Sequence, residues 1–220
     1  MIRKANDEAL DNMEPTKSGE IWVNQFNEAS ATKFREQMIQ VVMRDASMPI
    51  IIYIDSYGGY VYSLAKMMET MDQVPNPIIT VCMGKAMSCG AILLSHGHYR
   101  YCTPNSSVLI HEVSAGTEGD VHDMLNDATT TKKLNERFMG ILAENCNIKG
   151  GYKGLRKIIK DRDGRDINLD SKEALKFGIV DEVGSPGIAP QVIYHTQTIQ
   201  KIPRAQLVKR AKEVLGIKKK

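Results

Sequence analysis

The chain has 220 residues, with 29 Lys and Arg against 26 Asp and Glu, and a formal net charge of +3. Hydrophobic residues make up 42% and charged residues 25%, a balance typical of a soluble globular protein, which excludes a chain that is disordered throughout. No apolar run approaches the ~18 residues of a membrane-spanning helix, and the N-terminus lacks the apolar segment of a secretory signal, so we expect a cytoplasmic protein.

Charge is distributed unevenly between the ends of the chain. Residues 186–220 contain eight Lys and Arg against a single acid, Glu213, whereas the rest of the chain is mildly acidic. This shift predicts a basic C-terminal extension over 186–220, and the polar residues 1–19 predict a mobile N-terminal arm. Within the extension, the helical spacing of apolar residues over 205–215 favours a helix docked on the chain's own body, with binding of a partner or of nucleic acid as the alternative.

Between these ends, residues 20–185 predict one domain of alternating strands and helices. In chain order we expect a strand at 20–23, a helix at 30–44, a strand at 50–55, a helix at 60–71, a strand at 78–83, a helix at 87–95, and strands at 99–102 and 108–111. The apolar runs at 50–55 and 78–83 have the length of strands buried on both faces, as in a parallel sheet. The alternation predicts a layered α/β fold.

A long helix is expected over 120–145, with Asp120 as its N-cap and an apolar stripe along one side. It exceeds the ~11 residues of an average helix. Such length is typical of a helix that protrudes and packs against another subunit, and packing on the chain's own core is the alternative. The remaining elements are a Gly-rich loop at 149–154, a charge-dense segment at 161–171, a short helix at 171–177 and a strand at 179–183.

A serine among small residues is the first candidate for chemistry. Ser88 follows a buried strand, opens a helix, and has Ala86 and Gly90 two positions to either side. A nucleophilic serine needs an exposed hydroxyl on a sharp turn, and a helix N-terminus favours developing negative charge. The alternative is an ordinary N-cap serine. Cys89 offers an intrinsically better nucleophile, but one step along a helix turns its side chain away by ~100°, so we favour Ser88.

Two further segments contain the groups that such a serine needs. Gly58 and Gly59 follow the strand expected at 50–55. Paired glycines let backbone N–H groups point into a pocket, as an oxyanion hole requires. An ordinary strand-to-helix turn is the alternative. His111 ends an apolar strand, so it would lie at the rim of the sheet and could act as general base. A buried structural histidine is the alternative.

The order of these segments resembles the proteolytic subunit of the ATP-dependent Clp protease, a family of serine peptidases. That family carries an Asn-Ser-Pro-Gly-Gly-Ser-Val turn, a Gly-x-Ala-Ala-Ser-Met-Gly-Ala nucleophile segment and a Pro-Asn…Ile-His-Gln-Pro segment. The corresponding residues here are 55–61, 84–91, and 104–105 followed by 110–113. The resemblance runs over residues 20–184.

The resemblance implies a fold and a set of catalytic residues. The fold would be the ClpP/crotonase-like layered α/β arrangement of repeated β-α units, with 120–145 as its protruding handle helix. The implied triad is Ser88 as nucleophile, His111 as base and Asp166 as the acid that holds the imidazole tautomer. The sequence leaves a neighbouring acid, Asp161 or Asp163, as an alternative to Asp166.

The resemblance also implies the groups around the scissile bond. Gly59 and Cys89 would donate the two oxyanion N–H groups. Substrate would be held by backbone pairing, a mode that accepts many sequences. The residues implied in that pairing, and in shaping the turn beside it, are Gly58, Tyr60, Val61, Glu112 and Val113.

The segments depart from the family pattern beside the substrate groove. In the glycine turn, Tyr57 replaces the family's proline and Asp55 replaces its asparagine. Val113 replaces the proline that the family has two positions after the histidine. These differences concern specificity more than chemistry.

No metal or organic cofactor is expected. The four cysteines lack zinc-ligand spacing and are expected to be free thiols. No Walker motif is present, so ATP would be used by a separate AAA+ unfoldase. The resemblance implies a homo-oligomer of stacked heptameric rings that takes polypeptide substrates, without a nucleic-acid or membrane partner.

The leading hypothesis is therefore a serine endopeptidase that cleaves unfolded polypeptides inside a ring. A crotonase-like acyl-CoA enzyme, a catalytically silent ring subunit or capsid-assembly scaffold, and a phage capsid-maturation peptidase are the alternatives, the last by analogy alone. The scaffold would be favoured if Ser88 Oγ lay beyond ~3.5 Å from His111 with no rotamer that closes the gap.

Overall fold

The computed structural model describes residues 19–116, 118–162 and 166–187, so the expected arm and extension lie almost wholly outside the described residues. The strands are β1 (Glu20–Val23), β2 (Ile50–Ser56), β3 (Ile78–Met87), β4 (Tyr99–Cys102), β5 (Ser107–His111), β6 (Asp166–Asp170) and β7 (Glu182–Val183). The helices are α2 (Glu28–Arg44), α3 (Val61–Gln73), α4 (Cys89–Ser95), α5 (Val121–Asn145), α6 (Gly151–Asp161) and α7 (Ser171–Phe177).

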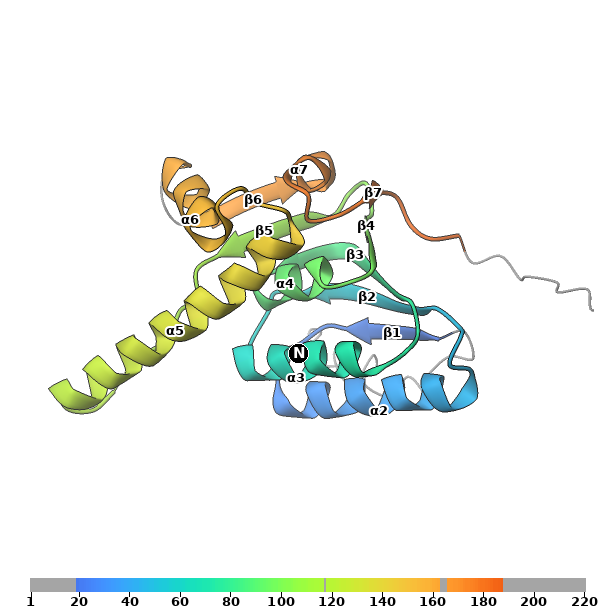
Figure 1. The fold of residues 1–220 in the computed structure, drawn as a ribbon, viewed down its shortest axis with the longest axis horizontal. Coiled ribbons are helices and arrows are strands. Elements are labelled where there is room, and N and C mark those ends of the chain that lie inside the picture. The colour runs from blue at the N-terminus through green and yellow to red at the C-terminus, as the bar shows by residue number, and fades with distance from the viewer. Residues whose placement is uncertain (1–18, 117, 163–165, 188–220) are drawn as a thin grey trace, which may run out of the picture. The chain divides into compact units, whose positions relative to one another are not determined.

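The described strands form a single mixed sheet (Figure 1). Its order is β1-β2-β3-β4-β7, and β5 pairs with both β3 and β6. The pairings are parallel except for the antiparallel β5–β6 pair. The central strands β2 and β3 are largely buried, as expected for a parallel sheet covered by helices. This confirms the layered α/β prediction.

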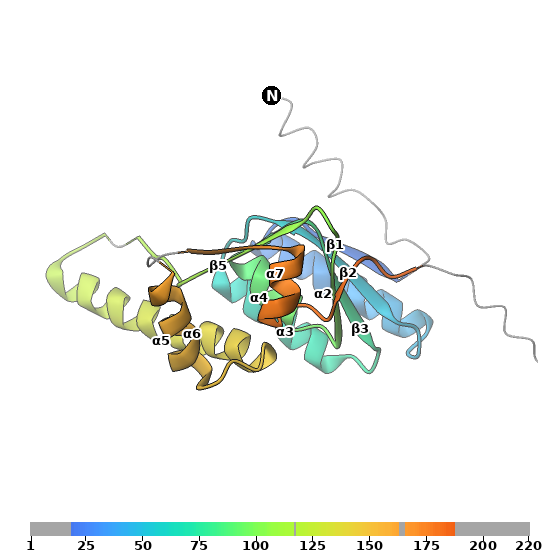
Figure 2. The ribbon, with the colours of Figure 1, turned by 90° about the horizontal axis from the view of Figure 1, so that it is seen from above.

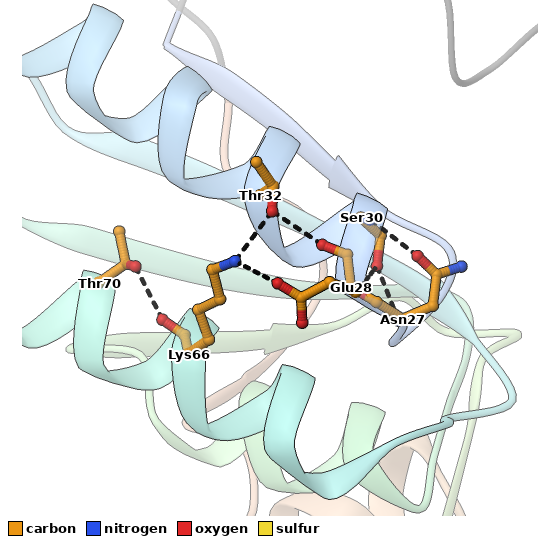
Figure 3. Close-up of polar contacts among 6 residues, drawn as sticks. All are labelled: Asn27, Glu28, Ser30, Thr32, Lys66 and Thr70. Atoms are coloured by element: carbon orange, nitrogen blue, oxygen red, sulfur yellow. Dashed lines mark hydrogen bonds and ion pairs between the residues drawn. The ribbon is translucent and has the colours of Figure 1, made fainter.

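Helices α2 and α3 lie side by side on one face of the sheet (Figure 1). Asn27 caps α2, because its Oδ1 accepts the Ser30 N–H at 2.8 Å while Ser30 Oγ accepts the Asn27 N–H at 2.9 Å. Lys66 of α3 reaches across to α2, where its Nζ lies 2.7 Å from Glu28 Oε1 and 2.9 Å from Thr32 Oγ1 (Figure 3). These contacts join the two helices at their solvent side.

Strand β3 changes its neighbour along its length. Residues 79–82 pair with β4, whereas residues 85–87 pair with β5. Between them Gly84 has a φ of +97°, and its N–H donates to the buried Ser106 Oγ at 2.7 Å. The end of β3 therefore lies against β5, which brings Ser88 beside the strand that ends at His111.

Helix α5 is anchored only at its C-terminal half. Phe138, Met139, Leu142 and Ala143 are buried, whereas every residue from 121 to 130 is exposed. The exposed half extends away from the sheet in both views (Figures 1 and 2). Asp120 Oδ1 accepts the N–H of His122, which confirms the predicted N-cap. No helix within the described ranges has both the length and the apolar character needed to cross a bilayer.

The predicted elements differ from the structure in three segments, of which the shortest is the strand expected at 179–183, where only β7 at Glu182–Val183 forms. The loop expected at 149–154 is wrong beyond its start, because α6 begins at Gly151 and buries Leu155 and Ile159, and burial of an apolar face outweighs the low helix propensity of glycine. The charge-dense segment contains β6, in which Ile167 and Leu169 are buried between exposed residues. That two-residue period is a strand signal that the prediction missed.

Candidate active site

Ser88 lies between β3 and α4 in a backbone conformation that residues with a side chain rarely adopt. Its φ of 55° and ψ of −119° fall in a region that costs about 1–3 kcal/mol. Its N–H donates to Leu109 O of β5 at 2.9 Å, and its carbonyl accepts the Ala91 N–H at 3.0 Å. The hydroxyl makes no capping hydrogen bond, so the N-cap alternative does not explain the residue. A strained strand-to-helix turn is the geometry that presents a nucleophile.

The glycine turn lies directly against Ser88. Gly58 has a φ of +103°, and a Cβ placed on it would lie 2.7 Å from Ser88 Cβ and 2.9 Å from Met87 O. A side chain at position 58 would therefore push the turn away from the serine. The Gly58 N–H donates to the buried Ser56 Oγ at 3.1 Å, which orients the peptide between Tyr57 and Gly58.

The peptide between Gly59 and Tyr60 is held at both ends. Tyr60 N–H donates to Phe26 O at 2.8 Å, and Cys89 Sγ donates to Gly59 O at 3.2 Å. A Cβ on Gly59 would overlap with Phe26 O, so only glycine fits this close approach. The Cys89 N–H belongs to the first turn of α4, where helix N–H groups have no intrahelical acceptor. The two predicted oxyanion donors therefore lie on neighbouring, well-fixed segments.

Cys89 itself is buried rather than presented to solvent. Burial raises the pKa of its thiol above the usual range, and a backbone hydrogen bond from Gly59 only partly offsets that effect. A protonated, buried thiol is a poor nucleophile. This supports the choice of Ser88 over Cys89.

The backbone of Tyr60 is not available for the pairing that the resemblance implied. Its N–H is taken by Phe26, and its carbonyl accepts the N–H groups of Ser63 and Leu64 at 3.1 Å as α3 begins. Val61 is already the first residue of that helix. The exposed Tyr60 side chain is the part that faces solvent beside the turn.

His111 and Asp166 are direct partners across the antiparallel β5–β6 pair. Residues opposite each other in such a pair have Cβ atoms about 4.5–5.5 Å apart on the same face. Asp161 is the last residue of α6, and Asp163 lies outside the described residues. The register therefore favours Asp166 over Asp161 as the partner of His111.

The imidazole of His111 has a defined hydrogen bond. Its Nδ1 lies 2.6 Å from Glu112 O, and because a carbonyl only accepts, Nδ1 is the donor in this hydrogen bond. Across the described residues no hydrogen bond joins His111 to Ser88 or to Asp166. The structure therefore brings the three segments together without closing the hydrogen bonds of a triad.

Asn135 of α5 holds the segment after His111, and sequence reasoning missed it. Asn135 Oδ1 accepts the Val113 N–H at 2.9 Å, and its Nδ2 donates to Glu112 Oε1 at 3.2 Å and to Tyr152 Oη at 3.1 Å. The residue is buried although it lies on a helix of mostly exposed residues. Its place in a helical pattern, at a position where neighbours are apolar, was the signal that could have revealed it.

The described residues contain no group of three or more His, Cys, Asp and Glu side chains arranged to hold a metal ion. The four cysteines are all buried and free, as the sequence predicts. Burial raises the pKa of Cys146 to about 12, so this thiol, like that of Cys89, stays protonated at neutral pH.

Comparison with known proteins agrees with this geometry. Residues 15–187 match the family model described as Clp protease. A curated relative, ATP-dependent Clp protease proteolytic subunit 1 of Salinibacter ruber (strain DSM 13855 / M31), is 36% identical over 164 residues, which cover 74% of this chain and 68% of the relative. The chain belongs to the Clp protease family. It is a serine-type peptidase by class, and its α/β sheet is consistent with the ClpP fold.

The range matched by the Clp protease family includes every segment of the candidate site. The Ser88 turn, the glycine turn and the β5–β6 pair all lie within residues 15–187. Membership of the Clp protease family leaves the acyl-CoA alternative without support.

Proposed function

We propose that the chain is a serine endopeptidase whose triad is Ser88, His111 and Asp166. The observation that carries the proposal is the contact of Gly58 with the strained Ser88 turn, beside a strand whose last residue is in register with Asp166. A nucleophile, an anion-binding turn and a base–acid pair thus come from adjacent segments of one sheet.

In acylation, Ser88 Oγ attacks the carbonyl carbon of the scissile peptide while His111 Nε2 takes its proton. The negative oxygen that forms accepts hydrogen bonds from the N–H groups of Gly59 and Cys89. A single donor of this kind is worth about 10²–10³ in rate. The imidazolium then gives its proton to the leaving amine, and an acyl-enzyme remains on Ser88.

In deacylation, His111 removes a proton from water, which attacks the acyl carbon and releases Ser88. Throughout, Asp166 would accept the Nδ1–H of His111 and stabilise the imidazolium. The proton on Nδ1 already matches this role, but its acceptor in the structure is Glu112 O. Catalysis therefore requires the ring to turn so that Nδ1–H donates its hydrogen bond to the Asp166 carboxylate instead of to Glu112 O.

The proposal includes a ring-shaped homo-oligomer that encloses the sites and a separate ATP-driven unfoldase that delivers unfolded polypeptide. Two features support it: the name of the Salinibacter relative describes an ATP-dependent proteolytic subunit, and the exposed half of α5 carries apolar side chains suited to a subunit contact. An ATP-driven partner implies a cytoplasmic location.

Active-site labelling of the full chain tests the chemistry. We expect a fluorophosphonate probe to modify wild-type protein and the variant Ser47→Ala, which loses a hydroxyl from an exposed loop. Ser88→Ala should abolish both the label and the cleavage of a fluorogenic peptide. Peptide cleavage that persists in Ser88→Ala would refute the assignment of the nucleophile.

A catalytically silent ring subunit is the second candidate, because one observation favours it. The Nδ1 of His111 is held by Glu112 O, and no hydrogen bond links the histidine to Ser88 or Asp166 in the described residues. A silent subunit would assemble into the ring and yet take no label. Native mass measured on the labelled sample therefore separates the two candidates.

A further inference from the structure

Three side chains meet beside the glycine turn and have no part in the triad. Lys85 lies on β3, three residues before Ser88, while Asp55 and Tyr57 lie on the other side, at the end of β2 and in the turn. Lys85 Nζ is 2.6 Å from Asp55 Oδ1 and 4.4 Å from the centre of the Tyr57 ring. One ammonium group therefore makes an ion pair and a cation–π contact at once.

These contacts span a break in the regular pairing of β2 with β3. Ile54 pairs with Cys82, but Ser56 pairs with Ala86, so one residue of β2 lies opposite three residues of β3. The single residue is Asp55. Extra residues of this kind bend a strand and re-aim its side chains, and they occur often beside active sites. The Lys85–Asp55 pair joins the strands where the ladder is interrupted.

The bend in β3 brings the Asp55 carboxylate against the backbone. A Cβ on Gly84, whose φ is +97°, would lie 3.0 Å from Asp55 Oδ1. The side chain of Lys85 is only 25% exposed, whereas Asp55 retains 42%. The ion pair is thus partly sheltered by the strand that it bridges, and less screened by solvent than a fully exposed pair.

Asp55 and Tyr57, the residues that Lys85 contacts, lead directly into the candidate oxyanion turn. Tyr57 is 73% exposed and precedes two glycines, which have the greatest backbone freedom of any residue. Its ring contacts Lys85, and the next residue, Gly58, touches Ser88. Lys85 therefore connects the strand that carries the nucleophile with the turn that would carry an oxyanion donor.

We propose that Lys85 is a positioning residue that holds Asp55 and Tyr57 so that the Gly58–Gly59 turn stays against Ser88. This inference rests on the proposed peptidase function for its effect on catalysis, but not for its effect on the order of the turn. An oxyanion hole depends on donors fixed before the reaction, and a loosened turn would weaken stabilisation of the transition state.

The test uses paired variants of the full-length chain. Lys85→Met keeps the apolar stem and removes the charge, whereas Lys85→Arg keeps a cation that can bind both Asp55 and the ring. Tyr57→Leu removes the ring, and Tyr57→Phe keeps it. Lys66→Met is the matched control, because it breaks a Lys–Glu pair of 2.7 Å between α3 and α2 (Figure 3) and touches neither Asp55 nor Tyr57.

Hydrogen exchange measured by mass spectrometry reports the order of the turn independently of activity. We expect faster exchange in the peptide covering residues 55–61 for Lys85→Met and Tyr57→Leu, with wild-type exchange in the two conservative variants and in Lys66→Met. Exchange in Lys85→Met that equals wild type would overturn the proposal.

The rate of fluorophosphonate labelling and peptide kinetics report the consequence. Lys85→Met should be labelled about tenfold more slowly, a smaller loss than removal of an oxyanion donor, because the donor is displaced rather than deleted. The loss should appear in kcat with KM changed by less than about twofold, since the contact acts in the transition state. Lys85→Arg should restore most of the rate.

The two readouts separate this inference from the proposed function. If the wild-type protein takes no label but residues 55–61 exchange faster in Lys85→Met than in wild type, the peptidase proposal fails. The positioning role of Lys85 then stands. If wild type is labelled through Ser88 and Lys85→Met matches it in both exchange and labelling rate, the positioning role of Lys85 is refuted. The peptidase proposal is then unaffected.

Discussion

At the scale of single residues, the strain at Ser88 has a consequence for stability. Its φ of 55° is compatible with glycine but costs a residue with a Cβ about 1–3 kcal/mol. Neither Ser88→Gly nor Ser88→Ala has a hydroxyl, but only glycine relieves the strain. We expect Ser88→Gly to exceed Ser88→Ala in free energy of unfolding by about 1 kcal/mol in urea titrations.

The matched comparison is at Ser47, which is not among the described residues with positive φ. There, Ser47→Gly should be less stable than Ser47→Ala, because glycine gains more freedom in the unfolded chain. Equal stability of Ser88→Gly and Ser88→Ala would contradict a strained turn in solution.

The sequence indicates Ser88 through its small neighbours but not through its strain. Ala86 and Gly90 show that backbone can crowd there, whereas the φ value depends on Leu109, a residue of another strand that accepts the Ser88 N–H. Asn135 was missed for a related reason. The apolar neighbours Phe138 and Met139 indicate that Asn135 is buried, but no local pattern reveals its contacts with Val113 and Glu112.

At the scale of elements, Arg100 joins three segments of the fold. From β4, its Nη2 contacts Asp181 Oδ1 at 2.6 Å, its Nε contacts Asp181 Oδ2 at 2.9 Å, and its Nη1 donates to Asn145 O at the end of α5 at 3.0 Å. The hydrogen bond from Arg100 holds the pKa of Asp181 below its usual range. The folded state thus binds this proton more weakly than the unfolded chain.

The sign of the pH dependence follows from that lowered pKa. The stabilisation is fully present above the unfolded value of about 3.9 and is lost as pH falls through the folded pKa. Asp181→Asn should lower the free energy of unfolding at pH 7 by about 1–3 kcal/mol. Its difference from wild type should shrink in urea titrations below pH 4.

Asp72→Asn is the control for this prediction. Asp72 pairs with His96 but is 64% exposed, so its loss should change stability little at pH 7. A gap between wild type and Asp181→Asn that stays constant from pH 7 to pH 3 would contradict the linkage.

The elements that local pattern specifies were predicted, and those that depend on tertiary contacts were not. The buried runs of β2 and β3 are visible in the sequence because both faces of a parallel strand are covered. Helix α6 begins with Gly151 and depends on the packing of Leu155 and Ile159. Strand β6 is five residues long and exposes alternate polar side chains, so its pairing with β5 defines it more than its composition does.

At the scale of the whole molecule, the candidate site follows from the topology of the sheet. The glycine turn comes after β2, Ser88 after β3 and His111 at the end of β5, all at the carboxyl ends of parallel strands. Open α/β sheets bind ligands at this edge. Asp166 enters from the antiparallel β6, and the sequence could indicate it only through the family resemblance.

Within the described residues, the N-terminal half of α5 is exposed and does not pack on the core. Val121, Met124 and Leu125 are 74%, 45% and 62% exposed near its N-terminus. Clustered apolar side chains of this kind mark interaction surfaces. In the proposed ring assembly this half of the helix contacts another subunit, so Leu125→Glu should weaken assembly by burying a charge in that contact.

Native mass of the purified protein checks this prediction against the 24.5 kDa of one chain. Leu125→Glu should shift the population toward smaller species, with unchanged circular dichroism, because the residue is largely exposed and is not part of the buried core cluster among the described residues. Thr130→Glu is the control, since it is also exposed but lies about 140° away around the helix. If Leu125→Glu has the same native mass as wild type, the subunit contact does not lie on this half of α5.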